Sequence, residues 1–220
     1  MTMTMTQNEN LNTVFWDRLA RKYAAQPIKN QAAYEKTLER TLEHLGPNDA
    51  VLELGCGTGS TALLLAGDVG AYLGTDFAPG MIGIADEKLQ AASEKGESPA
   101  GLSFAVADAF SEEVDRTGGY DAILGYNYLH LVEDPENVLA RVNSLLKPGG
   151  LFISKTVCLK SKAWLFLPLI KVMQLFGKAP HVRMHSFESV EDMISAAGFD
   201  IIETGTYPAP HSRFVVARKI

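Results

Sequence analysis

Short apolar runs alternate with amphipathic stretches along most of this 220-residue chain. The runs are bounded by turn signals rich in glycine, proline or aspartate, and they cover residues 50–54, 70–76, 102–108, 120–127 and 151–157. Helical periodicity fills most of the intervals, at 60–66, 81–94 and 135–146. Strands and helices in this rhythm are typical of βαβ units, so the pattern predicts an α/β fold with a parallel sheet.

Both ends of this pattern carry further elements. Apolar positions recur with helical spacing over 11–24 and 31–45, and we expect these two helices to form an N-terminal cap over 11–45. A last helix over 189–199 precedes two runs, at 199–207 and 212–219, that predict a closing hairpin.

The first ten residues, MTMTMTQNEN, differ from the rest of the chain. Residues 1–10 have neither an apolar run nor a basic start, so we expect a disordered tail and not a signal peptide. Residues 11–220 predict a single domain, and no run reaches the roughly 18 apolar residues that a membrane span requires. Cys56 and Cys158 lie far apart, which indicates no disulfide framework and favours a cytoplasmic location.

The first predicted strand runs directly into a glycine-rich turn. VLELGCGTGS (51–60) places Gly55, Gly57 and Gly59 at every second position, and a predicted helix follows. Glycine adopts positive φ and lets a ligand approach the backbone, and the following helix N-terminus offers free amide donors. This arrangement is typical of a nucleotide-type ligand at the carboxyl edge of a doubly wound sheet.

Two classes of ligand compete for this turn. The dinucleotide pattern G-x-G-x-x-G needs its third glycine one position later, where this chain has Ser60. Glu53, just before the turn, would repel a pyrophosphate but not a ligand that carries an ammonium and a sulfonium. The spacing therefore favours S-adenosylmethionine over a nicotinamide dinucleotide.

Acidic residues end the next two predicted strands. Asp76 follows the turn by about 20 residues, where an acid can accept both hydroxyls of a ribose. Asp108 ends the third strand, where it can meet the amino group of an adenine. Each acid also has a plainer interpretation as the cap of a helix or turn, and both interpretations stay open at this point.

Six short motifs, ELGCGTG, GTDFAPGMI, VADAF, YDAILGYNYLHLVEDP, LLKPGG and AAGF, occur in this order. In these motifs the chain resembles the class I S-adenosylmethionine-dependent methyltransferases, and most of all the small-molecule branch typified by ubiquinone/menaquinone-biosynthesis methyltransferases. The resemblance runs from about Phe15 to Gly150 and resumes at the last helix and hairpin. It implies a Rossmann-like seven-stranded sheet in the order 3-2-1-4-5-7-6, with strand 7 antiparallel and helices on both sides.

The resemblance also implies roles for individual residues. Residues at the first turn would hold the methionine end of the cofactor, and residues after the second and third strands would hold the ribose and adenine. Two residues after the fourth strand and one tyrosine of the cap would complete the site. The implied cofactor-binding residues are Tyr23, Glu53, Gly55, Gly57, Gly59, Asp76, Phe77, Met81, Asp108, Ala109, Gly125 and Tyr126. Phe77 and Met81 are equally well interpreted as core residues.

His130 is the candidate catalytic residue, because it follows the fourth strand and faces the expected transfer site. A neutral imidazole can take a proton from an acceptor, although a packing role for His130 is also open. We expect His44 to lie at the surface. The other histidines, His181, His185 and His211, have no metal-ligand spacing, so we predict no metal site.

The connection over residues 158–187 is unusually apolar and basic. Between Asn137 and Phe187 there is no Asp or Glu, whereas the whole chain has a formal net charge of −6. Its positive residues are Arg141, Lys147, Lys155, Lys160, Lys162, Lys171, Lys178 and Arg183.

We expect a short helix from Pro168 within this connection. Lys171, Gln174 and Lys178 would lie on one side of it, and Trp164, Leu167, Ile170, Met173 and Phe176 on the other. The helix is interpreted as core packing, as a lid over the acceptor, or as a surface helix that contacts an anionic membrane.

Together these patterns predict methyl transfer from S-adenosylmethionine to a small acceptor that is lipophilic or anionic. The alternatives are a non-catalytic scaffold or sensor that binds the same cofactor, and a nicotinamide-dependent oxidoreductase. We expect no nucleic-acid partner, because the chain is acidic overall and its basic connection is too apolar to follow a phosphate backbone.

Overall fold

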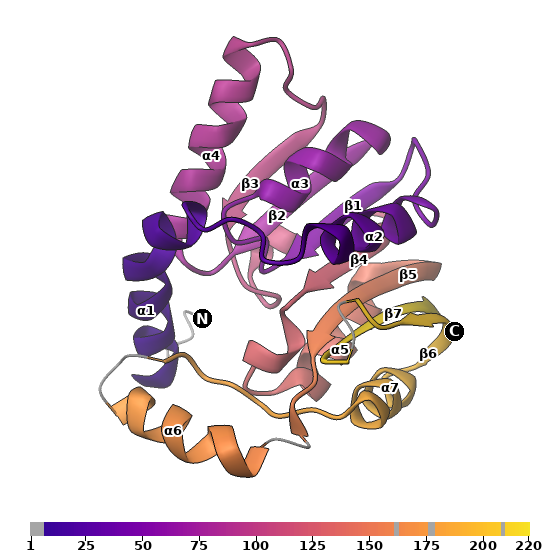
Figure 1. Ribbon diagram of the computed structural model, residues 1–220. Helices are drawn as coiled ribbons and strands as arrows, with labels where there is room; N and C mark the ends of the chain where they lie inside the picture. Colours follow the sequence, from indigo (N-terminus) through magenta and orange to yellow (C-terminus); the bar gives the residue numbers. More distant parts are fainter. Residues whose placement is uncertain (1–6, 161–162, 176–178, 208–209) are drawn as a thin grey trace.

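A seven-stranded sheet forms the centre of the molecule (Figure 1). The computed structural model describes residues 7–160, 163–175, 179–207 and 210–220. The strands are β1 (Ala50–Leu54), β2 (Ala71–Asp76), β3 (Leu102–Val106), β4 (Tyr120–Tyr126), β5 (Leu146–Val157), β6 (Phe199–Gly205) and β7 (Ser212–Lys219). Their order is β3-β2-β1-β4-β5-β7-β6, and β7 runs antiparallel to β5 and β6. The predicted order and strand direction are confirmed.

Helices cover both faces of this sheet (Figure 1). They are α1 (Gln7–Ala24), α2 (Gln31–Leu42), α3 (Ser60–Leu65), α4 (Pro79–Glu94), α5 (Pro135–Leu145), α6 (Ala163–Leu175) and α7 (Phe187–Ala196). One face packs against α2 and α3 through a cluster around Val51, Leu65 and Phe214, and the other packs against α5 and α7 around Leu52, Leu139 and Val190. These four helices bury their apolar stripes on the sheet, as amphipathic periodicity requires, whereas α1 packs against α4.

Local signals set where several helices begin. The Asn30 side chain accepts a hydrogen bond from the backbone N–H of Ala33 and so caps α2 at 3.0 Å. Asp134 caps α5 in the same way, and Ser186 with Ser189 forms a reciprocal capping box at α7. Such caps satisfy backbone donors that have no partner inside the helix.

Two predicted boundaries differ from the structure. Helix α1 begins at Gln7, so residues 7–10 are helical and not part of a tail, while residues 1–6 lie outside the described residues. Strand β5 begins at Leu146 and not at residue 151, because Leu146 pairs with Tyr120 across an irregularity in the β4–β5 register. A long-range pairing of this kind leaves no mark in the local sequence.

The predicted faces of the basic connection are also partly wrong. Pro168 lies inside α6 and does not start it. Trp164, assigned to the apolar inner side, is 78% exposed, while Gln174 is half-buried and donates to the backbone oxygen of Pro180 at 2.7 Å. Leu167 is half-buried as expected. Phe176 and Lys178 lie outside the described residues, and no helix of the described ranges is long and apolar enough to cross a membrane.

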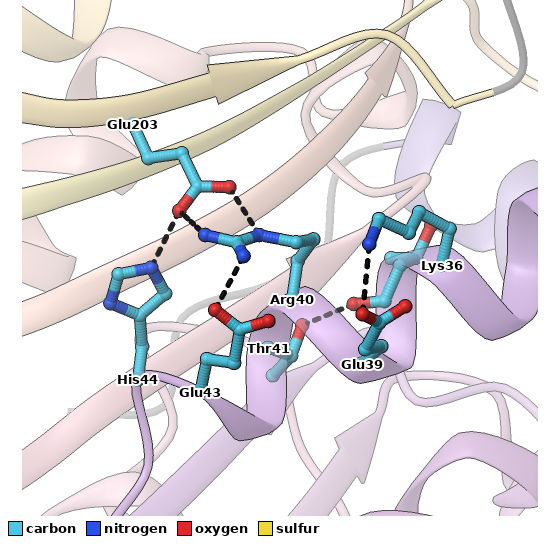
Figure 2. A network of polar contacts seen from close by, with 8 residues as sticks. Lys36, Glu39, Arg40, Thr41, Glu43, His44 and Glu203 are labelled. Carbon is cyan, nitrogen blue, oxygen red and sulfur yellow. Dashed lines mark hydrogen bonds and ion pairs between the residues drawn. The ribbon is translucent and has the colours of Figure 1, made fainter.

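A polar network attaches α2 to the far edge of the sheet (Figure 2). The guanidinium of Arg40 donates to both carboxylate oxygens of Glu203 on β6, at 2.8 and 2.6 Å, and also contacts Glu43. His44 lies 2.7 Å from the same carboxylate. His44 is therefore partly enclosed by an ion network, and its expected place at the surface is wrong.

This network predicts an acid-sensitive contribution to stability. Hydrogen bonds from Arg40, and secondarily from His44, hold the pKa of Glu203 at about 2, below its ordinary value of 4.5. A carboxylate with a lowered pKa stabilises the fold at neutral pH, and this stabilisation disappears as the pH falls from about 4.5 toward 2. Glu203→Gln is expected to lower the denaturant midpoint at pH 7, and the difference from the wild type should shrink steadily below pH 4.5.

Denaturation with urea, followed by circular dichroism between pH 2.5 and 7, measures this effect. Glu43→Gln is the matched control, because Glu43 contacts the same guanidinium from a more exposed position. An equal midpoint shift for both variants, or a Glu203 effect that does not depend on pH, would contradict the assignment.

Candidate functional site

The glycine-rich turn lies between β1 and α3 at the carboxyl edge of the sheet. Gly55, Gly57 and Gly59 all adopt positive φ, at +70°, +56° and +71°. A Cβ atom at Gly59 would lie 2.7 Å from the ring of Phe104 and 2.8 Å from the Cβ of Ala85. Only glycine fits this backbone and this packing, so the turn has the conformation that the sequence predicts.

Neighbouring elements hold the turn in place. The backbone N–H of Cys56 donates to the carbonyl of Thr75 at 2.8 Å. From α4, the ammonium of Lys88 donates to the carbonyl and hydroxyl of Thr58 at 2.9 Å and to the hydroxyl of Ser60 at 2.7 Å. The loop conformation is therefore built into the protein and does not wait for a ligand.

Asp76 ends β2 beside this turn, as predicted. Its carboxylate accepts hydrogen bonds from the backbone N–H of Gly57 at 3.0 Å and of Ala78 at 2.9 Å. Burial raises the pKa of this carboxyl, against the effect of the two backbone donors. Because a carboxylate offers about four acceptor positions, two of them remain for the hydroxyl groups of a ligand.

Glu53 is buried at the end of β1 and accepts a hydrogen bond from the hydroxyl of Tyr72 at 2.8 Å. Burial is the main cause that raises the pKa of Glu53 to about 7. Tyr23 of α1 lies beside the turn, where a Cβ atom at Gly57 would be 4.0 Å from its ring, and burial, with the charges of Asp76 and Glu53, raises the pKa of its phenol. The structure thus brings cap and turn together around two acids.

Tyr126 ends β4 on the same side, and its hydroxyl lies 2.5 Å from that of Thr41 on α2. Gly125 is buried next to it, and a Cβ atom there would lie 3.5 Å from the ring of Tyr128. Ala109 is also buried, with its carbonyl bonded to the guanidinium of Arg141 at 3.1 Å. These residues share the carboxyl edge with the turn.

Other predicted site residues have structural roles in this arrangement. Asp108 is exposed, and its carboxylate accepts from the backbone N–H of Phe110 at 2.7 Å and from the hydroxyl of Ser111 at 3.1 Å, so it caps a turn. Met81 is buried in a small core between α1 and α4, and Phe77 packs against that core. The contacts of Asp108 are thus those of a turn cap, and the contacts of Met81 are those of a core residue, which is the plainer of the two interpretations for each.

Tyr128 was missed from the sequence. Its ring lies over the turn, where a Cβ atom at Gly55 would approach it to 2.7 Å. Burial, with the charges of Asp108 and Asp76, raises the pKa of its phenol. Asn127, directly before it, has a φ of +52°, the sole positive value among non-glycine residues of the described ranges. Asparagine tolerates this conformation better than most residues. An asparagine directly after a predicted strand, followed by a tyrosine, was therefore the signal in the sequence that could have pointed to Tyr128.

The segment after α6 brings His185 close to His130. The backbone N–H of Arg183 donates to the carbonyl of His130 at 2.7 Å, and the backbone of Leu129 hydrogen-bonds the ring of His185. Within the described part of the chain, His130 Nδ1 and His185 Nε2 are buried without a hydrogen-bond partner. Burial and the neighbouring His185 lower the pKa of His130 to about 4.

The comparison with protein families decides the class of this site. The model of the methyltransferase-domain family matches residues 25–204, which include the turn, both acids and His130. The chain belongs to this methyltransferase family. It is an S-adenosylmethionine-dependent methyltransferase, so the nicotinamide alternative is wrong.

Curated relatives of the methyltransferase are large multidomain proteins. It is 32% identical over 158 residues to the hybrid PKS-NRPS synthetase apdA of Emericella nidulans. The matched region makes up 68% of this chain and 4% of that protein. It is 30% identical over 121 residues to the reducing polyketide synthase Preu2 of Preussia isomera, covering 53% and 5%. The chain thus spans a small part of the length of these relatives. The narrower likeness to quinone-biosynthesis enzymes stays a prediction.

Solved structures share the fold of the methyltransferase. Magnesium protoporphyrin IX methyltransferase from Synechocystis PCC 6803, with bound SAH, superposes with a TM-score of 0.70 at 20% identity and 97% coverage of both chains. The [4+2]-cyclase SpnF superposes with a TM-score of 0.73 at 18% identity, covering 100% of this chain and 98% of the other.

The residues of the methyltransferase fit S-adenosylmethionine. The preformed glycine turn leaves room at the backbone, Asp76 retains free acceptor positions for a ribose, and Glu53 offers an acid to an ammonium group. No group of three or more metal-ligating side chains occurs in the described ranges.

The raised pKa of Glu53 predicts pH-dependent cofactor affinity. Above pH 7 the ionised carboxylate attracts the ammonium of the methionine end, and below pH 7 protonation removes this attraction. The affinity for S-adenosylhomocysteine should fall by about tenfold from pH 8 to pH 6, and Glu53→Gln should bind weakly at both.

Titration calorimetry across this range measures the effect. Glu97→Gln, in an exposed loop, is the control and should follow the wild type. A wild-type affinity that stays constant from pH 6 to 8, or a Glu53→Gln variant that keeps full affinity, contradicts the role of Glu53.

Proposed function

We propose that this methyltransferase acts on a small lipophilic acceptor, which binds at the carboxyl edge beneath residues 179–186. The observation that supports this most directly is the course of that segment, which runs from α6 to α7 (Figure 1). It is attached to α1 by a 3.0 Å hydrogen bond from the backbone of His181 to Asn12, and to the turn after β4 through Arg183 and His130. Through these two contacts the segment joins the cap to the turn after β4, and this supports an acceptor position beneath it.

Buried polar atoms support an acceptor position under this segment. The hydroxyl groups of Ser154 and Thr156 on β5 are buried and, like His130 Nδ1, have no partner among the described residues. Native proteins rarely leave such atoms unsatisfied, so a water molecule or a ligand group is expected there.

The cofactor supplies a methyl group activated by an adjacent positive sulfur. The chain itself positions the reactants and excludes water, an effect that lowers barriers by up to about 7–11 kcal/mol. An acceptor that must lose a proton also needs a base, and we assign this role to His130. With a pKa of about 4, its imidazole is neutral at physiological pH and has a free buried nitrogen.

Two features favour a lipophilic acceptor. Helix α6 directs Leu167 and Ile170 inward, both half-buried. In addition, the relatives named above are a hybrid PKS-NRPS synthetase and a reducing polyketide synthase, which favours an acceptor of the polyketide class. An anionic acceptor is less well supported, because the positive charge of Arg183 is neutralised by Glu136 at 2.9 Å.

Location and membrane contact remain proposals. The free, buried thiols of Cys56 and Cys158 favour the cytoplasm. Trp164 and Val172 on the outer side of α6 are 78% and 53% exposed beside Lys171, which favours a transient contact with an anionic lipid surface.

The cofactor assignment is tested by calorimetric titration with S-adenosylhomocysteine and, in parallel, with NAD. We expect a dissociation constant of about 1–10 µM for the first and no measurable binding of the second. Asp76→Ala should weaken binding by about 100-fold, because it removes a buried charged acceptor and releases Gly57.

Asp200→Ala is the control, since Asp200 is exposed on β6, at the edge of the sheet that β1 and β2 do not share. Binding of NAD, or unchanged affinity in Asp76→Ala, would show that the site is misassigned.

The role of His130 is tested with His130→Gln, which keeps a polar side chain but not the base. We expect the methyl-transfer rate to fall by about 10²–10⁴-fold while the affinity for S-adenosylhomocysteine is unchanged. Transfer of a labelled methyl group to a panel of lipophilic 1,3-dicarbonyl and phenolic compounds measures the rate.

The matched control is His211→Gln, which changes a histidine that follows β6 in the chain. Equal rates for the His130 variant and the wild type on every methylated compound would reject His130 as the base.

A further inference from the structure

Lys155 is a buried cation for which the mechanism above has no use. It lies two residues before the end of β5, near the carboxyl edge, and 8% of its surface is exposed. Its ammonium has one long hydrogen bond, 3.4 Å to the hydroxyl of Thr37 on α2. In residues 7–160 and the other described ranges, no carboxylate lies within ion-pair distance of this ammonium.

The surroundings of Lys155 do not compensate its charge. Thr37 uses its own proton to bond the carbonyl of Ala33 at 2.8 Å, so it offers Lys155 one neutral acceptor. An ammonium removed from water without an anion is costly, and burial accordingly lowers the pKa of Lys155. A lysine in such a position is explained if an anion joins it when a ligand binds.

The strand register shows what lies beside it. Tyr126 pairs with Lys155, and Leu124 pairs with both Glu53 and Ile153. Because alternate residues of a strand share a face, Glu53, Tyr126 and Lys155 all project from neighbouring strands toward α2. Val51, Leu124 and Ile153, two positions before each of them, lie together in the core under α2 and confirm this face.

Glu53 and Lys155 are therefore an acid and a base on the same face of the sheet, and Lys155 lies two residues nearer the carboxyl edge than Ile153, which is level with Glu53. Strands β1 and β5 are separated only by β4, so their backbones lie about 10 Å apart. Tyr126, level with Lys155 on β4, adds a hydroxyl group that lies 2.5 Å from that of Thr41. Such a polar face is complementary to a zwitterion that carries an ammonium at one end and a carboxylate at the other.

We propose that Lys155 binds the carboxylate of the amino-acid end of the cofactor, opposite the ammonium held by Glu53. This inference rests on the proposed cofactor site and adds to it a cation contributed by β5. It assigns the two charges of the amino-acid end to two different strands, with Tyr126 between them. Lys155 is thus a binding residue for the cofactor and not a base for the acceptor.

The test compares two ligands that share the nucleoside and the sulfur. S-adenosylhomocysteine carries the amino-acid carboxylate, whereas 5′-methylthioadenosine does not. In Lys155→Met, the affinity for the first should fall by about 10- to 100-fold, the loss expected for one hydrogen-bonded ion pair. The affinity for 5′-methylthioadenosine should stay within about twofold of the wild type.

Three controls isolate the charge of Lys155. Lys160→Met makes the same change at an exposed position five residues along the chain and should bind like the wild type. Lys155→Arg should restore part of the affinity for S-adenosylhomocysteine, because it retains the cation. Thermal unfolding of Lys155→Met should show no loss of stability, since methionine fills the same volume without a buried charge.

Unchanged affinity of Lys155→Met for S-adenosylhomocysteine overturns the proposal and leaves the cofactor site itself intact. An equal loss for both ligands also overturns it, because the variant would then have distorted the site through α2. A wild-type protein that binds 5′-methylthioadenosine as tightly as S-adenosylhomocysteine rejects the carboxylate contact as well. If the wild type binds neither ligand, the cofactor site and the proposal fall together.

Discussion

The site depends on one buried carboxylate that accepts two backbone N–H groups. Asp76 joins the turn after β1, through Gly57, to the turn after β2, through Ala78. Both turns lie at the carboxyl edge, where parallel strands direct their loops to one side of the sheet. Because the carboxylate holds two loops at once, the left-handed conformation of the glycine turn and the start of α4 are determined together.

The helical cap extends this arrangement to the start of the chain. Asp17 on α1 accepts a hydrogen bond from the backbone of Gly80 at 2.7 Å, and Arg40 on α2 binds Glu203 on β6. These contacts fix the two helices against α4 and β6, and a Cβ atom at Gly57 would lie 4.0 Å from the ring of Tyr23 on α1. The cap thus reaches the glycine turn from a distant part of the sequence.

The fold alone does not determine the reaction. A protoporphyrin methyltransferase and a [4+2]-cyclase superpose on this chain with TM-scores of 0.70 and 0.73. What such proteins share is the sheet and the place of its carboxyl edge, whereas acceptors meet the loops and insertions above that edge. In this chain we propose that these parts are the turn after β4 and residues 179–186.

The sequence by itself determined the alternation of strands and helices, the glycine turn and the positions of Asp76 and Glu53. These features depend on local patterns, since apolar runs, glycine spacing and strand-end acids mark them directly in the chain, whereas the strand order was implied only by the resemblance to a known family. Only the tertiary structure decided that Asp108 caps a turn, that Met81 packs against α1, that Trp164 is exposed and that Tyr128 covers Gly55. Lys155 belongs to the same group, because only the register shows that it lies level with Tyr126 and on the same face of the sheet as Glu53. Contacts between distant segments follow from packing and pairing, and the periodicity of a single segment cannot contain them.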